Sequence, residues 1–330
     1  MPAPITISKL DLRMRARVVS ERCLAYDSVD GVGQNPPKHV RAGSALGMLG
    51  GKLVVVQDES DWVATVDGPA GPVTGYQLRA PAGGSLAKLR QDGHLQLRGL
   101  IVAKDWKGEF LLAFGAGSTP LGRHIARIRF SGADTELSIF DARRFYAGLE
   151  EYDDFATSTL NLEGVALVPK GLDGRDAVRL FQRANLKPRR DGRPLSATCD
   201  IRLDALSLYL DRCRREPGAS LGTEFANVRR YDLEERDEVP YSFTDAALLP
   251  SGKMLFAAAA EREGKNLSTT FGVIEPDGTS RYTYLVEKDG TPSTRLAEGI
   301  AAIGDTKACL VANPVGDAPT NLCAIDLTGF

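Results

Sequence analysis

Polar side chains recur at one kind of position in this chain, directly before an apolar run that is expected to form a β-strand. The residues at these five openings are Ser44, Arg98, Glu163, the pair Thr244 and Asp245, and Glu298. A carboxylate at the entry to an apolar strand is poorly explained by core packing, because a buried carboxylate must be paired or bind a cation. The five openings are therefore candidates for a shared binding site.

Three arrangements would satisfy these carboxylates. Calcium takes roughly six to eight oxygen ligands in loose geometry, and Glu163, Glu298 and the Ser44 and Thr244 hydroxyls are candidate ligands. Arg98 offers an alternative, since its guanidinium would pair with a glutamate or bind a carboxylate or phosphate of a ligand. A purely structural ion-pair network is the third alternative.

A second set of polar residues ends the strand that follows each opening. It consists of Gln57, Asp58, Arg183, Asn185, Glu261 and Asn313. Antiparallel pairing returns the end of a second strand to the level at which the first begins. Asp58 or Glu261 would then act as a general base on water, and Arg183 would hold an oxyanion. Asn185 and Asp245 are candidate ligand contacts, and the alternative for the whole set is turn capping or rim salt bridges.

The elements that must position these residues repeat five times. Each copy has a small or polar opening, an apolar strand, a Gly or Asp turn, a second apolar strand and a polar exit. The copies span residues 42–58, 97–117, 162–185, 244–261 and 297–314. Two more strands fit behind each of the first four copies, but one strand, at 321–327, follows the fifth. The alternating segment 5–18 is expected to supply the strand that the last sheet lacks.

Five four-stranded sheets closed by both ends of the chain predict an all-β fold, a five-bladed β-propeller in one domain over residues 1–330. Six blades remain an alternative, because segment 207–220, expected to be a long hairpin or insertion, leaves room for another blade. A β-sandwich is the other alternative. In a propeller the first strand of each blade lines the central channel, so the five openings would meet at one mouth.

Two further expectations concern packing. Segment 141–152 is the best candidate for a short helix, because Phe145, Leu149 and Tyr152 recur at helical spacing. Trp62 and Trp106 are expected to pack between blades.

Composition excludes several classes of protein. The 330 residues are 43% hydrophobic and 25% charged, as is usual for soluble globular proteins. A net charge of −2 without a basic stripe predicts no nucleic-acid partner. No apolar run of about 18 residues exists, which predicts no membrane span, and the first residues lack the apolar core of a signal peptide. Five scattered cysteines favour reduced thiols and a cytoplasmic location.

The openings and exits resemble those of the calcium-activated nucleotidases (apyrases), five-bladed propellers with one central calcium. The segment SALGMLGGKLVVVQDES resembles the first-blade segment of that family, LEGVA and AEGIAAI place two glutamates, and FTDAALLP places a threonine where the family has serine. The chain departs from the family at Arg98, where the family has a ligand glutamate, and at Gln57, which replaces one residue of an acidic pair. The overall pattern is more similar to uncharacterised bacterial propeller proteins with LEG, TDA and EG openings.

The resemblance implies hydrolysis of a phosphate ester or anhydride, hence a small anionic substrate, at the channel mouth. It places calcium at Ser44, Glu163, Thr244 and Glu298, where the ion would polarise the phosphoryl oxygen. It places Asp58, Arg183 and Glu261 in catalytic positions. A binding module without turnover, built on an Arg98–Glu163–Glu298 cluster, is one alternative function. A calcium-dependent lactonase or esterase is the other.

Overall fold

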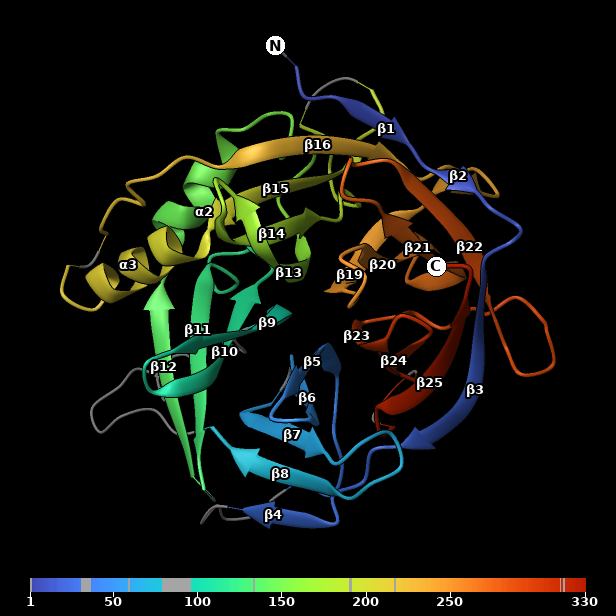
Figure 1. Ribbon diagram of the computed structural model, residues 1–330, viewed down its shortest axis with the longest axis horizontal. Helices are drawn as coiled ribbons and strands as arrows, with labels where there is room; N and C mark the ends of the chain where they lie inside the picture. Colours follow the sequence, from blue (N-terminus) through green and yellow to red (C-terminus); the bar gives the residue numbers. More distant parts are fainter. Residues whose placement is uncertain are drawn as a thin grey trace.

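The strands are arranged as sheets around a common centre, with the first strand of each sheet innermost (Figure 1). This computed structural model describes residues 2–30, 37–58, 60–78, 96–132, 134–189, 192–216, 218–314, 316 and 318–330. The first sheet contains β5 (Gly43–Leu49), β6 (Lys52–Gln57), β7 (Trp62–Val66) and β8 (Val73–Gln77), with β4 (Ser28–Asp30) at its edge. The second contains β9 (Leu97–Asp105), β10 (Gly108–Gly115), β11 (His124–Ser131) and β12 (Asp134–Asp141).

The remaining strands repeat the same antiparallel order. The third sheet contains β13 (Leu162–Leu172), β14 (Arg175–Gln182), β15 (Ser196–Arg202) and β16 (Ala226–Asp232), edged by β1 (Ile5–Ile7). Next come β19 (Ser242–Leu248), β20 (Met254–Arg262), β21 (Lys265–Ile274) and β22 (Ser280–Val286), edged by β2 (Lys9–Leu10). The last set is β23 (Gly299–Gly304), β24 (Lys307–Ala312), β25 (Asn321–Thr328) and β3 (Arg15–Cys23). The five expected two-strand copies are thus confirmed as strand pairs.

An N-terminal strand completes the last set of strands, as predicted. β3 pairs antiparallel with β25 from Cys23 opposite Asn321 to Arg15 opposite Thr328. The expected segment, 5–18, was placed too early, because its first half forms β1 and β2, which pair parallel with β16 and β22. β3 also pairs parallel with β22, where Ala16 lies opposite Leu285, so β19–β22 and β23–β25 with β3 form one continuous sheet. We call these two halves the fourth sheet and the last sheet. The start of the chain therefore runs along the outer edge of three sheets (Figure 1).

Glycines allow the inner strands to approach one another closely. Each inner strand contacts the next, in the closed order β5, β9, β13, β19, β23 and back to β5. A Cβ atom on Gly99 would lie 2.0 Å from Cγ2 of Val165, and one on Gly299 would lie 2.7 Å from the backbone nitrogen of Leu46. Such positions accept only glycine without movement of the neighbouring strand. The glycine that follows Arg98, Glu163 and Glu298 is therefore a packing requirement.

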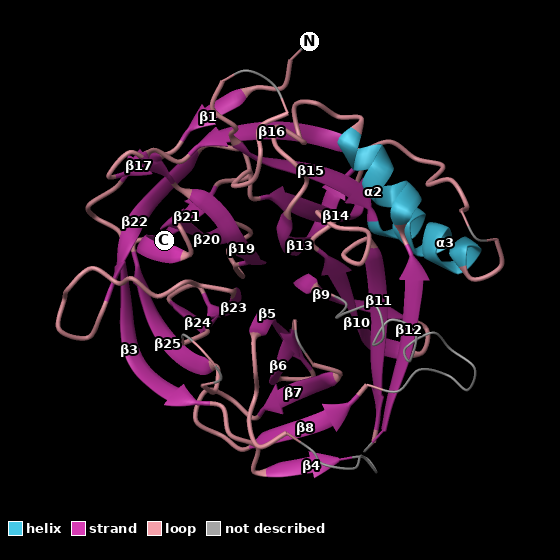
Figure 2. Cartoon of the chain, turned by 180° about the vertical axis from the view of Figure 1, so that it is seen from behind, coloured by secondary structure: helices cyan, strands magenta, loops and turns pink. Residues whose placement is uncertain are grey.

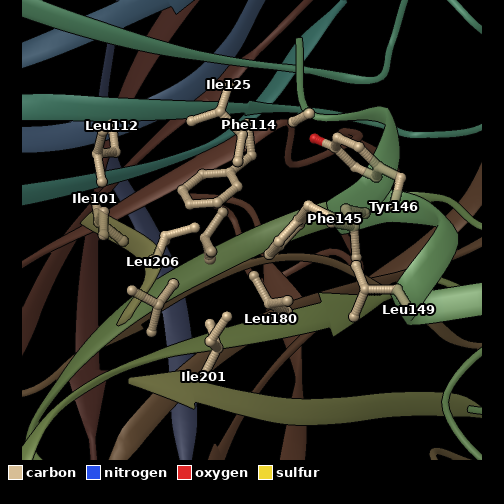
Figure 3. Packing of buried hydrophobic residues seen from close by; sticks show 14 of the residues in the cluster. Ile101, Leu112, Phe114, Ile125, Phe145, Tyr146, Leu149, Leu180, Ile201 and Leu206 are labelled. Atoms are coloured by element: carbon tan, nitrogen blue, oxygen red, sulfur yellow. The ribbon is translucent and has the colours of Figure 1, made fainter. Parts of the chain in front are cut away.

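Helices cover the junction between the second and third sheets (Figures 1 and 2). The expected helix is confirmed as α2 (Arg143–Glu150), which buries Phe145, Tyr146 and Leu149. Figure 3 shows these side chains packed with Phe114 and Leu180 from the two sheets.

Segment 207–220 was expected to be a long hairpin or an insertion, and the hairpin is wrong. The segment begins inside α3 (Leu203–Cys213), and residue 217 lies outside the described residues. The physical reason is the spacing of Leu206, Tyr209 and Leu210, which lie on one helical face and are buried in the same core. The following residues lead into β16, and a short ribbon of β17 (Glu235–Arg236) and β18 (Val239–Pro240) precedes β19.

The two tryptophans have opposite environments. Trp62 is buried, as expected for packing, whereas Trp106 is 88% exposed, so the prediction for Trp106 was wrong. Trp106 lies in the turn between β9 and β10, where Asp105 is opposite Gly108, and a side chain at a turn tip points away from both strands.

Two other expectations bear on the class of protein. All five cysteines have free thiols. Within the described ranges, no helix has the length and apolar character needed to cross a membrane.

Gly299→Ala is expected to lower the free energy of unfolding by about 1–3 kcal/mol, because the new Cβ would meet backbone atoms of Ala45 and Leu46. Urea unfolding followed by circular dichroism measures this change. Gly304→Ala is the matched control in the same strand, since its Cβ would meet nothing within 4 Å. Equal losses in the two variants would contradict the packing role of Gly299.

Candidate functional site

A β-bulge holds the polar opening residue at the start of each of four inner strands. In β5 the register passes from Gly43 opposite Gln57 directly to Ala45 opposite Val56, which leaves Ser44 without a partner on β6. The same shift leaves out three other opening residues: Arg98, Glu163 and Thr244. A bulge leaves the extra residue unpaired and re-aims its side chain. The four openings therefore share one backbone device.

Glu298, the fifth opening residue, is held at the entry to its strand by a related backbone pairing. Its backbone N–H donates to the Val311 carbonyl at 3.0 Å, and Val311 also lies opposite Gly299. Two residues at the entry to β23 thus share one partner on β24.

Arg98 forms the first of two carboxylate–arginine–carboxylate bridges. Its Nη2 atom donates to Oδ2 of Asp58 at 2.7 Å, and its Nη1 atom donates to Oε2 of Glu298 at 3.3 Å. Asp58 follows β6 and Glu298 precedes β23, so this arginine of the second sheet connects the first and last sheets. The Arg98 side chain is 27% exposed, which leaves it accessible from solvent.

Arg183 forms the second bridge. Its Nη1 atom donates to Oε1 of Glu163 and its Nη2 atom to Oε2 of Glu261, each at 3.4 Å. Its Nε atom lies 3.4 Å from Oγ of Ser242. The guanidinium therefore ties the third sheet to the fourth while its side chain remains 6% exposed. We call the six bridge residues the charged ring: Asp58, Arg98, Glu163, Arg183, Glu261 and Glu298.

The electrostatic properties of the charged ring follow from burial and from like charges. The pKa of Glu298 is raised from its ordinary value of 4.5 to about 7, chiefly by burial. Arg98 and Arg183 oppose this rise, and Glu163 and Glu261 add to it, so the two bridges act on one another. The ring contains four carboxylates and two guanidiniums, an excess of two carboxylates if all are ionised.

Asp245 lies beside the ring and links two inner strands. Its Oδ2 atom accepts a hydrogen bond from the Ile300 backbone at 2.6 Å, which joins β19 to β23. Burial raises the pKa of Asp245 well above its usual range, and the charges of Glu163 and Glu298 add to the rise. Asp245 was predicted as a ligand contact, and in this structure its carboxylate is hydrogen-bonded to the protein backbone.

Asn161, which was not among the predicted site residues, supports the ring from one side. Its Nδ2 atom donates to Oε1 of Glu163 at 3.0 Å and to Oδ1 of Asn185 at 2.9 Å. Asn161 thereby places the predicted contact Asn185 next to Glu163. The available signal was its position two residues before Glu163 in LNLEG, because such residues share a face in a strand.

The hydroxyls of the ring mouth have different partners. The Ser44 hydroxyl donates to the Leu97 carbonyl at 2.6 Å, which ties β5 to the start of β9. Oγ1 of Thr244 is buried and has no hydrogen-bond partner among the described residues. A buried polar atom without a partner is a candidate for contact with a ligand or an ion.

Two exit residues serve the scaffold. The amide of Gln57 accepts from the Arg41 backbone at 2.8 Å and donates to the Trp62 carbonyl at 2.8 Å. Asn313 donates to the Gly43 carbonyl at 3.1 Å, which ties the last sheet to the first. Through these contacts, the side chains of Gln57 and Asn313 hold neighbouring backbone segments in place.

One cavity lies in the channel between the inner strands, and another lies beside the second bridge. The channel between the inner strands has a volume of about 240 Å³ and apolar walls that include Leu46, Leu100 and Ile300. A second cavity, of about 380 Å³, lies between the third and fourth sheets and is lined by Arg183, Asn185, Ser242 and Glu261. We call it the interface pocket.

The predicted calcium ligands are distributed between the two bridges. Glu163 contacts Arg183 and Glu298 contacts Arg98, while Ser44 and Thr244 supply hydroxyls. Within the described part of the chain, no group of three or more His, Cys, Asp or Glu side chains is placed to hold a metal ion. The excess of carboxylates and the unpartnered Thr244 hydroxyl fit a cation, whereas the arginine contacts compete with one.

Comparison with known proteins identifies a family. The model of a "Family of unknown function (DUF6929)" matches residues 39–321. No curated protein matches the sequence.

Solved structures match the chain at low identity and with TM-scores below 0.5. A glutaminyl cyclase from Myxococcus xanthus is 10% identical with a TM-score of 0.47, over 99% of this chain and 100% of its own. The PQQ-bound aldose sugar dehydrogenase of Streptomyces coelicolor is 12% identical with a TM-score of 0.44, over 96% and 99%. The β-propeller domain of Cps50 (Swd1) from Myceliophteria thermophila is 11% identical with a TM-score of 0.35, over 84% and 66%. Their chemistry is not transferred to this chain.

Glu298→Gln is expected to remove a pH dependence of stability. Because the folded pKa of Glu298 lies above its ordinary value, the folded state holds this proton more tightly. The stabilisation is complete below pH 4.5 and is lost as the pH rises through about 7. From about pH 5 to about pH 8, the unfolding free energy of the parent protein should fall by about 2 kcal/mol relative to the variant. Urea unfolding at both pH values measures this, with the exposed Glu136→Gln as control. Parallel pH profiles for the parent and Glu298→Gln would contradict it.

Proposed function

We propose that this chain, which belongs to the DUF6929 family of unknown function, is a ligand-binding propeller. Its charged ring binds a small molecule or an ion that carries a positive charge. The observation that carries the proposal is the pair of bridges, in which each arginine already has two carboxylate partners. An entering cation would balance the remaining excess of carboxylates.

The ring favours a cation over the small anion expected from the sequence. An anionic ligand would have to displace Asp58 or Glu298 from Arg98, or Glu163 or Glu261 from Arg183. A displaced carboxylate would then be left partly buried and unpaired, which is strongly unfavourable. A cation needs no such displacement, because it is attracted to the carboxylates without taking an arginine from any of them.

The same proposal includes five blades in one domain over residues 1–330. The closed order of β5, β9, β13, β19 and β23 supports this count. The region in which a sixth blade was considered contains α3, β16 and the short ribbon of β17 and β18 among its described residues. Free thiols at all five cysteines support a cytoplasmic location as part of the proposal.

Calcium-dependent hydrolysis of a phosphate ester or anhydride is the second candidate function. The unpartnered Thr244 hydroxyl favours it, and Ser44, Glu163, Thr244 and Glu298 would hold the ion. Calcium would polarise the phosphoryl oxygen when bound. Asp58 and Glu261 each accept a hydrogen bond from an arginine, so the carboxylates that would have to activate water are already engaged. That engagement places hydrolysis second, together with a calcium-dependent lactonase or esterase at the same residues.

Calorimetric titration with calcium chloride, benzylamine hydrochloride and sodium phosphate tests the choice between cation and anion. At least one of the two cations should bind, and Glu163→Gln should weaken its binding about tenfold, equivalent to about 1.4 kcal/mol. Sodium phosphate should not bind. The exposed Glu136→Gln serves as the matched control and should leave binding unchanged. Binding of phosphate but of neither cation would refute the proposal.

A panel of nucleotides, aryl esters and lactones, assayed with calcium chloride, separates binding from turnover. The binding proposal expects no substrate to be consumed. Calcium-dependent turnover that Glu163→Gln abolishes would instead establish the second candidate.

A further inference from the structure

The interface pocket is continuous with the charged ring through two shared residues. Arg183 and Glu261 line the pocket and also form the second bridge. The pocket has a volume of about 380 Å³, within the range of small-molecule sites. A molecule in this pocket would therefore place one end against the ring carboxylates.

The rest of the pocket wall combines polar and apolar residues. Its apolar part is formed by Ala184, Leu186, Pro194, Val239, Pro240 and the ring of Tyr241. Val239 and Tyr241 are buried, and Tyr241 packs on Tyr282 with ring centroids 6.1 Å apart, so this wall is fixed. A bare metal ion gains nothing from such a wall, whereas an organic body gains from burying its apolar surface there.

Charge decides which end of the molecule meets the ring. The pocket contains two carboxylates, Glu261 and Glu263, and one guanidinium, Arg183. The guanidinium already contacts Glu163, Glu261 and Ser242. Ser196 holds this corner in place, because its hydroxyl donates to the Arg183 carbonyl at 3.1 Å and accepts from the Phe243 N–H at 3.3 Å. The pocket therefore favours a ligand group that carries a positive charge.

We infer that the ligand of the charged ring is an organic cation, an amine on a compact apolar body. Its ammonium group lies beside Glu261 at the ring and its body fills the interface pocket. This inference rests on the proposed function and narrows it from any cation to an amine with an apolar body. An ammonium group has three hydrogen-bond donors, which suits a site bordered by two carboxylates.

The test uses benzylamine as the probe, with benzyl alcohol as its uncharged counterpart and calcium chloride as the metal. Leu186→Trp narrows the pocket at a residue that is 37% exposed and so tolerates a larger side chain. Leu208→Trp, on α3 and 64% exposed, is the matched control away from the pocket. Calorimetry on the whole chain should show that benzylamine binds, that benzyl alcohol does not, and that Leu186→Trp weakens benzylamine binding at least about tenfold. Leu208→Trp should change nothing.

The outcomes separate this inference from the proposed function. If calcium chloride binds in a manner sensitive to Glu163→Gln while benzylamine does not bind, the organic cation is refuted and the proposed cation site stands. If benzylamine binds equally well to the parent and to Leu186→Trp, the pocket assignment is overturned. If neither cation binds, both the inference and the proposed function fail.

Discussion

Charge pairing across sheets is the interaction on which the centre of this protein depends. At several positions the inner strands lie too close together for a side chain larger than glycine. The polar side chains at the channel mouth are partly or wholly buried. Arg98 and Arg183 resolve the conflict among the carboxylates by each binding two of them. Removing one member of a buried pair leaves an uncompensated charge, at a cost of roughly 3–5 kcal/mol. The bridges therefore serve both the architecture and the site.

The sequence was sufficient to predict an all-β fold built from repeated strand pairs, because strand patterning is a local property. The five two-strand copies, the completing strand near the N-terminus and helix α2 all follow from periodicity and turn residues. Helix α3 was missed because Leu206, Leu208 and Leu210 alternate in the sequence, a spacing that also fits a β-strand. Trp106 was misplaced because a large aromatic residue carries no sign of whether it lies in a strand or at the tip of a turn.

The candidate site was predictable as a set of residues but not as a set of contacts. The openings recur in the sequence, so Glu163, Arg98 and Glu298 could be selected as members of one ring. Which carboxylate each arginine binds depends on how the sheets are placed around the axis. Arg98 meets Asp58, 40 residues away, and Arg183 meets Glu261, 78 residues away. No local pattern encodes such distances, and the bulges that aim these side chains appear only once register is known.

The strand that completes the last sheet pairs with a strand that lies far later in the sequence, and this pairing ties folding to the order of synthesis. Cys23 and Asn321 are neighbours in the sheet although 298 residues separate them. β3 leaves the ribosome long before β25, its partner, is made. Until β25 is made, one edge of β3 lacks its partner, and exposed strand edges invite pairing with other chains. Contacts of such long sequence separation also slow folding, because the loop must close before they form. Closure therefore protects the strand edges of the folded protein and delays that protection until β25 has been synthesised.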